Sequence, residues 1–306
     1  MTLKNWALLV LTAMLFGSSF PLINVAVAEV PPMYIALARV TIAALILLGF
    51  LFATGRRLPP FGAGWRPLLV LGVLSAALPY FAIAWGQAHI NSSLGGILFA
   101  TIPIFTIILA PIFVDEARLP AKRMVGVAVA FAGVVTAIGV EHLFQFGGQA
   151  LGAAATLVAA LSYAIGNIYA RTQTALHPFQ MAAGQMLAAT AILIPLTLLY
   201  GSPAITAPGP VTILATIAVA IVSTAMPVIL MFTLIKRVGA TQTSLLAFFI
   251  PVAAVLIGVI ALGEPLGALT LLGFAMVIAG AVWATRTPAN ALIPAEPLPP
   301  KRSHAE

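Results

Sequence analysis

An internal repeat constrains the fold of this chain more than any other feature of its sequence. The stretch 78–116 recurs 148 residues later with the same marked positions: Pro79, Pro103 and Glu116 correspond to Pro227, Pro251 and Glu264. The polar break in each copy, His89-Ile90-Asn91 and Arg237-Val238-Gly239, falls at the same offset. At offsets of 146 or 147, further pairs align: Phe16 with Tyr163, Pro32 with Pro178, Arg39 with Gln185, Gly126 with Gly273 and Gly133 with Gly280. Such self-similarity predicts two alike halves of about 145 residues each.

The composition excludes a soluble protein. Of the 306 residues, 62% are hydrophobic and only 7% are charged, and the mean hydropathy is +1.13. A soluble domain carries about 25% charged residues, so this chain cannot cover itself with a solvated surface. It is therefore predicted to be an integral membrane protein. The absence of cysteine excludes disulfides, thiolate metal sites and cysteine nucleophiles.

Apolar runs long enough to cross a bilayer occur ten times. A transmembrane helix needs about 20 apolar residues. The runs that meet this requirement cover residues 5–27, 32–54, 67–88, 92–114, 121–140, 149–171, 178–200, 210–235, 240–262 and 266–285. The expected fold class is an all-α membrane protein with ten transmembrane helices. The remainder, residues 287–306, is rich in proline and polar residues, which predicts a disordered tail.

The first run has two interpretations. Lys4, the apolar stretch that follows it and the small residues Ala26-Val27-Ala28 together resemble a signal peptide with its cleavage site. The same run, however, contains Phe16, which has the repeat counterpart Tyr163. A cleaved leader would not need such a counterpart, so the repeat favours a retained helix.

The placement of the basic residues predicts the orientation of the chain. With ten spans, both termini and the even-numbered loops lie on one side of the membrane. That side holds thirteen of the fourteen basic residues: Lys4, Arg56, Arg57, Arg66, Arg118, Lys122, Arg123, Arg171, Lys236, Arg237, Arg286, Lys301 and Arg302. The other side holds only the acids Glu29, Glu141 and Glu264. The positive-inside rule places both termini, and with them the tail, in the cytoplasm. The high pI reflects this topology and attraction to anionic lipid, so nucleic acid is not an expected partner.

Five spans in each half require the second half to enter the membrane inverted. Residues 1–141 are predicted to form the first five-helix repeat and residues 142–286 the second, inverted one. Inverted repeats are typical of secondary transporters, whose substrate sites lie near the middle of the membrane between the halves.

Three short motifs resemble those of a known family. They are Leu15-Phe16-Gly17-Ser18-Ser19-Phe20 in the first span, Pro32 with Ala36-Leu37-Ala38-Arg39 in the second, and Gly263-Glu264-Pro265 after the ninth. On these residues the chain resembles the drug/metabolite transporter superfamily in its ten-helix bacterial exporter form, the EamA type. Asp115-Glu116 departs from the Gly-Glu that the family carries at that loop. The resemblance implies a multi-pass protein of the bacterial inner membrane that exports small molecules by alternating access.

Four prolines lie near the middle of their spans. Pro79, Pro103, Pro227 and Pro251 each remove a backbone hydrogen bond and disturb the preceding turn. Static kinks are one interpretation, because proline is common in membrane helices. The duplication of the pair supports the other interpretation, hinges that bend during alternating access.

Arg39 is the one charged side chain clearly inside a span, about seven residues or roughly 10 Å from its outer end. Charges at such depth are costly to insert. Two roles stay open: a structural lock paired with Glu29 or Glu264, or a binding group for a substrate carboxylate. The counterpart Gln185 is polar but neutral, so the two halves differ at this position.

Aromatic and polar residues share helix faces in the spans that line the cavity in the family, namely the first, third, fourth and their repeats. Side chains three or four residues apart lie on one helix face. The candidate cavity residues are Phe16, Ser19, Phe20, Asn24, Arg39, Tyr80, Trp85, Phe99, Tyr163, Asn167, Gln185, Met226, Ser244 and Phe248. As a set they suit a flat, apolar substrate with a small polar head. For any one of them, helix packing or lipid contact is the alternative role.

Repeated glycines indicate a close helix contact away from the substrate. Gly126 and Gly133 have heptad spacing, and so do their counterparts Gly273 and Gly280. Small residues let membrane helices approach closely. These glycines are therefore expected to pack helices and not to touch substrate.

The chain lacks the residues that several other classes of protein need for their function. The chain contains no P-loop or other nucleotide motif, no metal-ligand pair at i,i+4 and no evident nucleophile–base pair for an intramembrane hydrolase. No acidic residue lies deep in a span, whereas proton relays use such residues. A non-enzymatic transporter without cofactor or metal is expected. Its partners are a small-molecule substrate and membrane lipid, and a monomer is plausible.

The leading interpretation is an inner-membrane secondary transporter that exports small organic metabolites. Its aromatic residues and single buried arginine resemble the amino-acid exporters of the family, those for aromatic amino acids in particular. The alternatives are export of another metabolite or a drug-like compound, a channel, and a membrane scaffold. A cationic substrate would require a buried acid, and a channel would require a continuous polar path. A scaffold would not explain the kinked, inverted repeat. Uniport and proton-coupled antiport both remain open.

Overall fold

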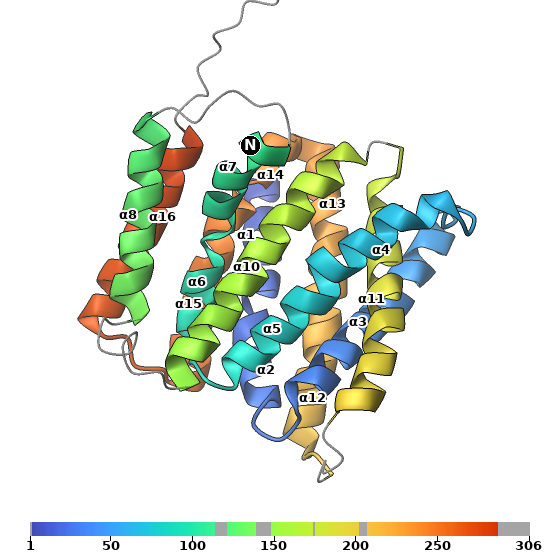
Figure 1. The fold of residues 1–306 in the computed structure, drawn as a ribbon, viewed down its shortest axis with the longest axis horizontal. Coiled ribbons are helices and arrows are strands. Elements are labelled where there is room, and N and C mark those ends of the chain that lie inside the picture. The colour runs from blue at the N-terminus through green and yellow to red at the C-terminus, as the bar shows by residue number, and fades with distance from the viewer. Residues whose placement is uncertain (1, 114–120, 139–147, 174, 202–206, 287–306) are drawn as a thin grey trace, which may run out of the picture.

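The structure is a computed structural model of the whole chain, and it describes residues 2–113, 121–138, 148–173, 175–201 and 207–286. Within these ranges every regular element is a helix (Figure 1). The expectations for Glu116, for the boundary between the halves at residues 141–142 and for the tail 287–306 lie outside the described residues.

The helices follow the predicted apolar runs, and several runs are divided into two helices. In chain order they are α1 (Leu3–Gly17), α2 (Ser19–Ala26), α3 (Pro32–Ala53), α4 (Arg66–Gly72), α5 (Leu78–Gln87), α6 (Ser92–Phe99), α7 (Ile102–Phe113), α8 (Ala121–Ile138), α10 (Gly148–Thr172), α11 (Pro178–Tyr200), α12 (Pro210–Ala220), α13 (Met226–Val238), α14 (Ala240–Thr243), α15 (Leu246–Leu262) and α16 (Ala268–Arg286). A short 3₁₀ turn, Ala63–Trp65, precedes α4.

Seven helical stretches in the described part of the chain are long and apolar enough to cross a membrane. Three shorter apolar helices, Met124–Ile138, Leu246–Leu262 and Ala268–Ala284, lie where the fifth, ninth and tenth spans were predicted. The all-helical membrane fold is thus confirmed. The count of ten spans and the side on which the termini lie stay predictions.

Helix contacts occur in pairs that are related by exchanging the two halves of the chain. α10 packs on α5 as α1 packs on α13, α11 packs on α4 as α3 packs on α12, and α10 packs on α7 as α1 packs on α15. Two further contacts, α3 with α11 and α8 with α16, join equivalent helices, and α6 packs on α15, which belongs to the equivalent span of the other half (Figure 1). The repeat in the sequence is therefore also a repeat in the packing, and each half completes its core with helices of the other.

The third span of each half contains a π-helical segment immediately before its first proline. The segments are Val73–Ala77 and Ile221–Ala225, and they keep the offset of 148 residues. The backbone N–H of Leu78 donates to the carbonyl of Val73, five residues back, and the N–H of Met226 does the same to Ile221. A proline ring collides with the carbonyl four residues before it. The wider π turn gives Pro79 and Pro227 room inside a continuous span.

The other two prolines are not structurally equivalent. Pro103 is the second residue of α7, which begins after a break in the span. The first N–H groups of a helix have no acceptor within it, so a proline there costs no helical hydrogen bond. Pro251 lies inside the continuous helix α15. All four prolines lie within apolar helical stretches, but only Pro79 and Pro227 share the same local structure, and the role of all four as hinges stays a prediction.

The repeated glycines bring α8 and α16 into backbone contact at one edge of the molecule (Figure 1). A Cβ added to Gly133 would lie 2.7 Å from the carbonyl oxygen of Gly273 and from the amide nitrogen of Val277. A Cβ on Gly126 would lie 2.8 Å from the carbonyl oxygen of Gly280. Packing, not hydrophobicity, drives helix association in lipid, so the expected close approach is confirmed.

Charged residues divide between the two ends of the bundle. The N-terminus, the start of α4 and the end of α13 lie together at one end, and α2 and α12 reach the opposite end (Figure 1). The first end carries the described basic residues Lys4, Arg56, Arg57, Arg66, Arg171, Lys236 and Arg237. The opposite end carries Glu29 and Glu264. This division is the one that the sequence predicted for a helical membrane protein.

A histidine caps α11 at the basic end. Nδ1 of His177 accepts from the backbone N–H of Phe179 at 3.2 Å, and Gln180 reciprocates by accepting from the N–H of His177 at 2.9 Å. Burial lowers the pKa of His177, and the charges of Arg56 and Lys236 lower it further. A protonated ring cannot accept at Nδ1, so the cap requires the neutral form.

Acidification is expected to weaken this cap. Because the pKa of His177 is lower in the folded protein than the usual value of 6.5, its contribution to stability is complete above that value. The contribution is lost as the pH falls through the folded-state pKa. His177→Asn, which caps without titrating, should therefore lose less melting temperature than the native protein between about pH 7 and pH 5. Equal losses in detergent-solubilised protein would contradict the capping role.

Candidate functional site

Arg39 lies buried where helices of both halves meet. It belongs to α3, and its side chain is 6% exposed. Nε donates a hydrogen bond of 2.8 Å to Oγ1 of Thr224, in the second π segment. The guanidinium carbon lies 3.8 Å from the ring centroid of Tyr80, a close cation–π contact. Nη1 is buried and has no hydrogen-bond partner among the described residues.

Thr224 holds Arg39 through the irregular backbone of the π segment. Its hydroxyl accepts from Arg39 and donates at 2.8 Å to the carbonyl of Val219, five residues back. When the two halves are exchanged, Ala76 takes the position of Thr224 and Val228 takes that of Tyr80. Gln185, the counterpart of Arg39, therefore has no counterpart of either partner of Arg39 to bind. Only the first half contributes a cationic group here.

The proposed pairing of Arg39 with Glu29 or Glu264 is wrong, because both carboxylates are bound elsewhere. Glu29 accepts from the backbone N–H of Gly209 at 2.7 Å, and this bond lowers the pKa of Glu29. Glu264 accepts from the backbone N–H groups of Ser92 and Ser93, at 2.7 and 2.8 Å, and from the hydroxyl of Ser93. Each acid satisfies the orphan donors at the start of a helix from the other half. No described carboxylate neutralises Arg39.

An aromatic row extends from Arg39 across the interior. We define it as Tyr80, Tyr163, Phe99 and Phe20, which come from α5, α10, α6 and α2. Ring centroids are 6.3 Å apart between Tyr80 and Tyr163, 5.4 Å between Tyr163 and Phe99, and 5.3 Å between Phe99 and Phe20. The last two contacts are edge-to-face, a favourable geometry for aromatic pairs. Arg39 and the four rings, all of them predicted cavity residues, thus form one continuous set of contacts.

Other predicted cavity residues lie near this set or serve the backbone. Phe16 packs beside the same core cluster as Tyr80, and Ser19 is buried at the start of α2. Asn24 donates to the carbonyls of Gln87 and Ile90, at 3.1 and 3.3 Å, and so caps the end of α5. Gln185 is half-buried where α11 packs on α4.

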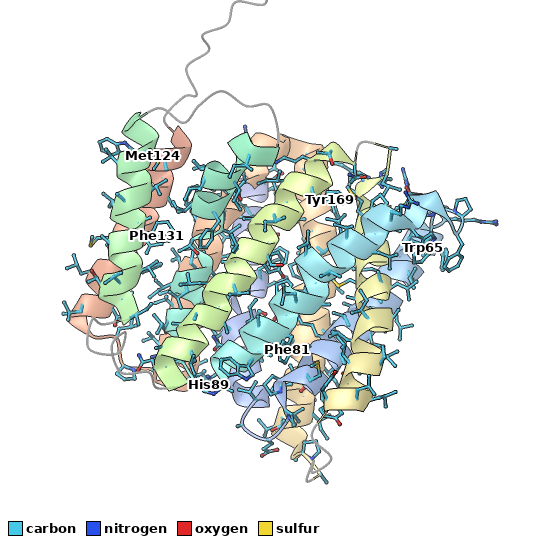
Figure 2. The ribbon with its side chains drawn as sticks, viewed as in Figure 1. Trp65, Phe81, His89, Met124, Phe131 and Tyr169 are labelled. Carbon is cyan, nitrogen blue, oxygen red and sulfur yellow. The ribbon has the colours of Figure 1, made fainter. Side chains whose placement is uncertain are left out.

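The remaining predicted residues lie away from Arg39. The ring of Trp85 lies 4.2 Å from that of His89, at the end of the bundle opposite the N-terminus (Figure 2). Asn167 is exposed on α10, and Ser244 is exposed between α14 and α15. Phe248 packs on the cluster around Ile104. Met226 is 44% exposed, so its side chain lies on the outer surface of the bundle and not in its interior.

Three polar residues near the site were not identified from the sequence. Thr224 binds Arg39, the hydroxyls of Ser223 and Ser18 share a hydrogen bond of 2.8 Å, and Gln87 is buried beside Phe20. Thr224 and Ser223 lie in the π segment immediately before the duplicated proline Pro227, and that proline was a usable signal. Thr224 and Ser223 bind residues of other helices, and the neighbours of Gln87, Phe20 and Gly95, also lie on other helices, so no spacing along one helix reveals these contacts.

A bundle of apolar helices with two matched halves and a buried polar group between them defines a multi-pass membrane protein of transporter type. The chain belongs to the EamA-like transporter family, whose model matches it twice, over residues 4–139 and 150–286. This confirms the resemblance noted in the sequence, and it shows the family repeat in both halves.

Relatives of nearly full length carry transporter names. The chain is 28% identical to the uncharacterized inner membrane transporter YedA of Escherichia coli, over 93% of this chain and 90% of that protein. It is 27% identical to a probable terminal-alkyne amino-acid exporter of Streptantibioticus cattleyicolor, over 92% and 93% of the two chains. An uncharacterized transporter of Archaeoglobus fulgidus is also 27% identical, over 91% and 97%. The protein is therefore a multi-pass transporter of the inner membrane.

A solved crystal structure shares the fold. It superposes with a TM-score of 0.66 over 92% of this chain and 98% of that one, at 20% sequence identity. At this identity the likeness concerns the architecture alone. It agrees with the arrangement of helices described above.

Proposed function

We propose that this protein exports small organic metabolites, and foremost amino acids with aromatic or apolar side chains, by alternating access between its two halves. The observation that carries the proposal is the environment of Arg39. Its guanidinium is buried, is bound only by a neutral hydroxyl and an aromatic face, and keeps Nη1 unpaired in the described structure. An uncompensated buried charge is strongly unfavourable, and a substrate carboxylate would supply the missing partner.

The aromatic row supports a substrate with a flat or apolar side chain. Its rings offer large apolar surfaces next to the only described cationic group of the interior. An amino acid combines a carboxylate for Arg39 with a side chain for the rings. The name of the Streptantibioticus relative, an amino-acid exporter, points to the same substrate class.

Other substrates and other classes fit these contacts less well. A drug-like cation would be repelled by Arg39 and would find both described acids of the outer loops bound to backbone N–H groups. A channel needs a continuous polar path, whereas the residues packed around Arg39 are mostly apolar. A scaffold needs neither a buried unpaired charge nor duplicated π segments.

Counterflow in proteoliposomes tests the proposal. Purified protein should exchange at least one aromatic or apolar amino acid from a panel, in a saturable manner, with equal pH on both sides. No acid lies deep in a span, so the exchange should not require an imposed pH difference. Transport of cations or neutral drugs without any amino acid would support the alternative exporter. Unsaturable flux would indicate a channel.

The proposed orientation places both termini in the cytoplasm, on the side of the basic residues. Single cysteines can report it, because the chain contains none. Arg57→Cys should react with an impermeant thiol reagent only from the cytoplasm, and Ala28→Cys only from outside. Labelling of both from the same side would contradict the topology.

A further inference from the structure

Gln87 is a second buried polar side chain without partners. It is the last residue of α5 and is 2% exposed, yet neither Oε1 nor Nε2 has a hydrogen-bond partner in the part of the chain that the structure describes. Buried amides are normally paired, and an unpaired one is unfavourable. An exception of this kind calls for an explanation.

The neighbouring helix reserves space for this amide. A Cβ built on Gly95 of α6 would collide with Nε2 of Gln87 and would lie 3.2 Å from the ring of Phe20. Only glycine at position 95 therefore accommodates the amide where it lies. Phe20 is also the last ring of the aromatic row, so the row ends at Gln87 just as it begins at Arg39.

We propose that Gln87 is a second contact for the transported substrate and that it recognises the head group of an α-amino acid. A primary amide offers an acceptor, Oε1, to the substrate ammonium and a donor, Nε2, to the substrate carboxylate. A guanidinium such as that of Arg39 offers donors only. The amide thus distinguishes a zwitterion from a simple carboxylate, which Arg39 alone cannot do. This inference rests on the proposed function and specifies its substrate class.

The spacing makes the two contacts successive and not simultaneous. Tyr80, which stacks on Arg39, and Gln87 lie seven residues apart on one face of α5, about 10 Å along the helix. The ammonium and the carboxylate of one amino acid share a single carbon and cannot span that distance. The aromatic row lies between the two contacts and supports the side chain as the head group passes from one to the other.

The fold itself does not require an amide at this position. The repeat counterpart of Gln87, 148 residues further on, is Ile235. The second half therefore fills the equivalent place with hydrocarbon. Asn24 binds the backbone carbonyl of Gln87 and not its side chain, so that contact does not require an amide either.

Gln87→Leu separates binding from structure. A structural glutamine would destabilise the protein on removal, whereas an unpaired amide kept for substrate should leave the melting temperature unchanged or raise it. Counterflow of L-phenylalanine should then fall about ten-fold or more, while 3-phenylpropanoate, which lacks the ammonium that Oε1 would bind, should lose less of its ability to compete. Thr197→Val is the matched control, because Thr197 also buries an unpaired hydroxyl, in α11. It should leave counterflow unchanged.

Each contrary result has a distinct meaning. Unchanged counterflow in Gln87→Leu, with transport that still depends on Arg39, overturns the role of Gln87 and leaves the proposed function intact. A lower melting temperature with a proportional loss of transport assigns Gln87 to the fold and also overturns it. Absence of L-phenylalanine counterflow in the native protein overturns the inference, and absence for every amino acid of the panel overturns the proposed function as well.

Discussion

Arg39→Gln should abolish amino-acid transport, by about a hundred-fold or more, in a protein that still folds and inserts. The guanidinium is the one described cationic group of the interior, and its unpaired Nη1 is available to a carboxylate. Glutamine is a suitable replacement because the other half of the repeat carries Gln185 at the matching position. Since Arg39 has no acidic partner among the described residues, its removal leaves no carboxylate unpaired. The melting temperature should be unchanged or higher.

Two further variants refine this result. Arg39→Lys should recover only part of the activity, because an ammonium cannot bind a carboxylate bidentately and stacks less well on Tyr80. Thr224→Val removes the hydroxyl that accepts from Nε and keeps the guanidinium. It should therefore reduce transport less than Arg39→Gln does.

Transport and melting temperature measured on the same preparations decide the role of Arg39. Loss of transport with an unchanged melting temperature supports substrate binding. Loss of both would assign Arg39 to the architecture of the α3–α12 interface. Normal transport and normal stability would show that the charge is solvated in the membrane and serves neither role.

Gly133→Ala should cause the largest loss of stability. The added methyl group would lie within 2.8 Å of three atoms of α16, two of them backbone, and no rotamer change can relieve contacts with backbone. Overpacking of this kind costs about 1–3 kcal/mol. The pair α8 and α16 lies at the edge of the bundle, so the two helices should separate before the rest of the fold is affected. A fall of several degrees in melting temperature is the expected measurement.

Gly49→Ala is the matched control for this prediction. Gly49 lies within α3, and a Cβ added there meets nothing within 4 Å. Alanine is the better helix former, so this variant should be as stable as the native protein or slightly more so. Equal melting temperatures for the two variants would show that the α8–α16 contact is looser than described.

The sequence alone determined the class of the protein and the outline of its fold. Run length and composition predicted where the helices lie, because a membrane-spanning segment must satisfy its backbone hydrogen bonds internally and face lipid with apolar side chains. The π segments were not predicted from the sequence, but they lie 148 residues apart, at the offset of the repeat. The spacing of Gly126 and Gly133 predicted a close helix contact, since small residues at regular intervals leave a groove.

Which candidate residues come together was decided only by the tertiary structure. Periodicity identifies the residues that share a face of one helix, but it does not say which face of another helix is opposite. Phe20, Phe99, Tyr80 and Tyr163 form one row, whereas Met226 and Ser244, equally plausible by spacing, lie on exposed surfaces. Arg39 binds Thr224, 185 residues away, and not the nearby Glu29. Such choices depend on how helices of the two halves pack, and that packing is a property of the whole chain.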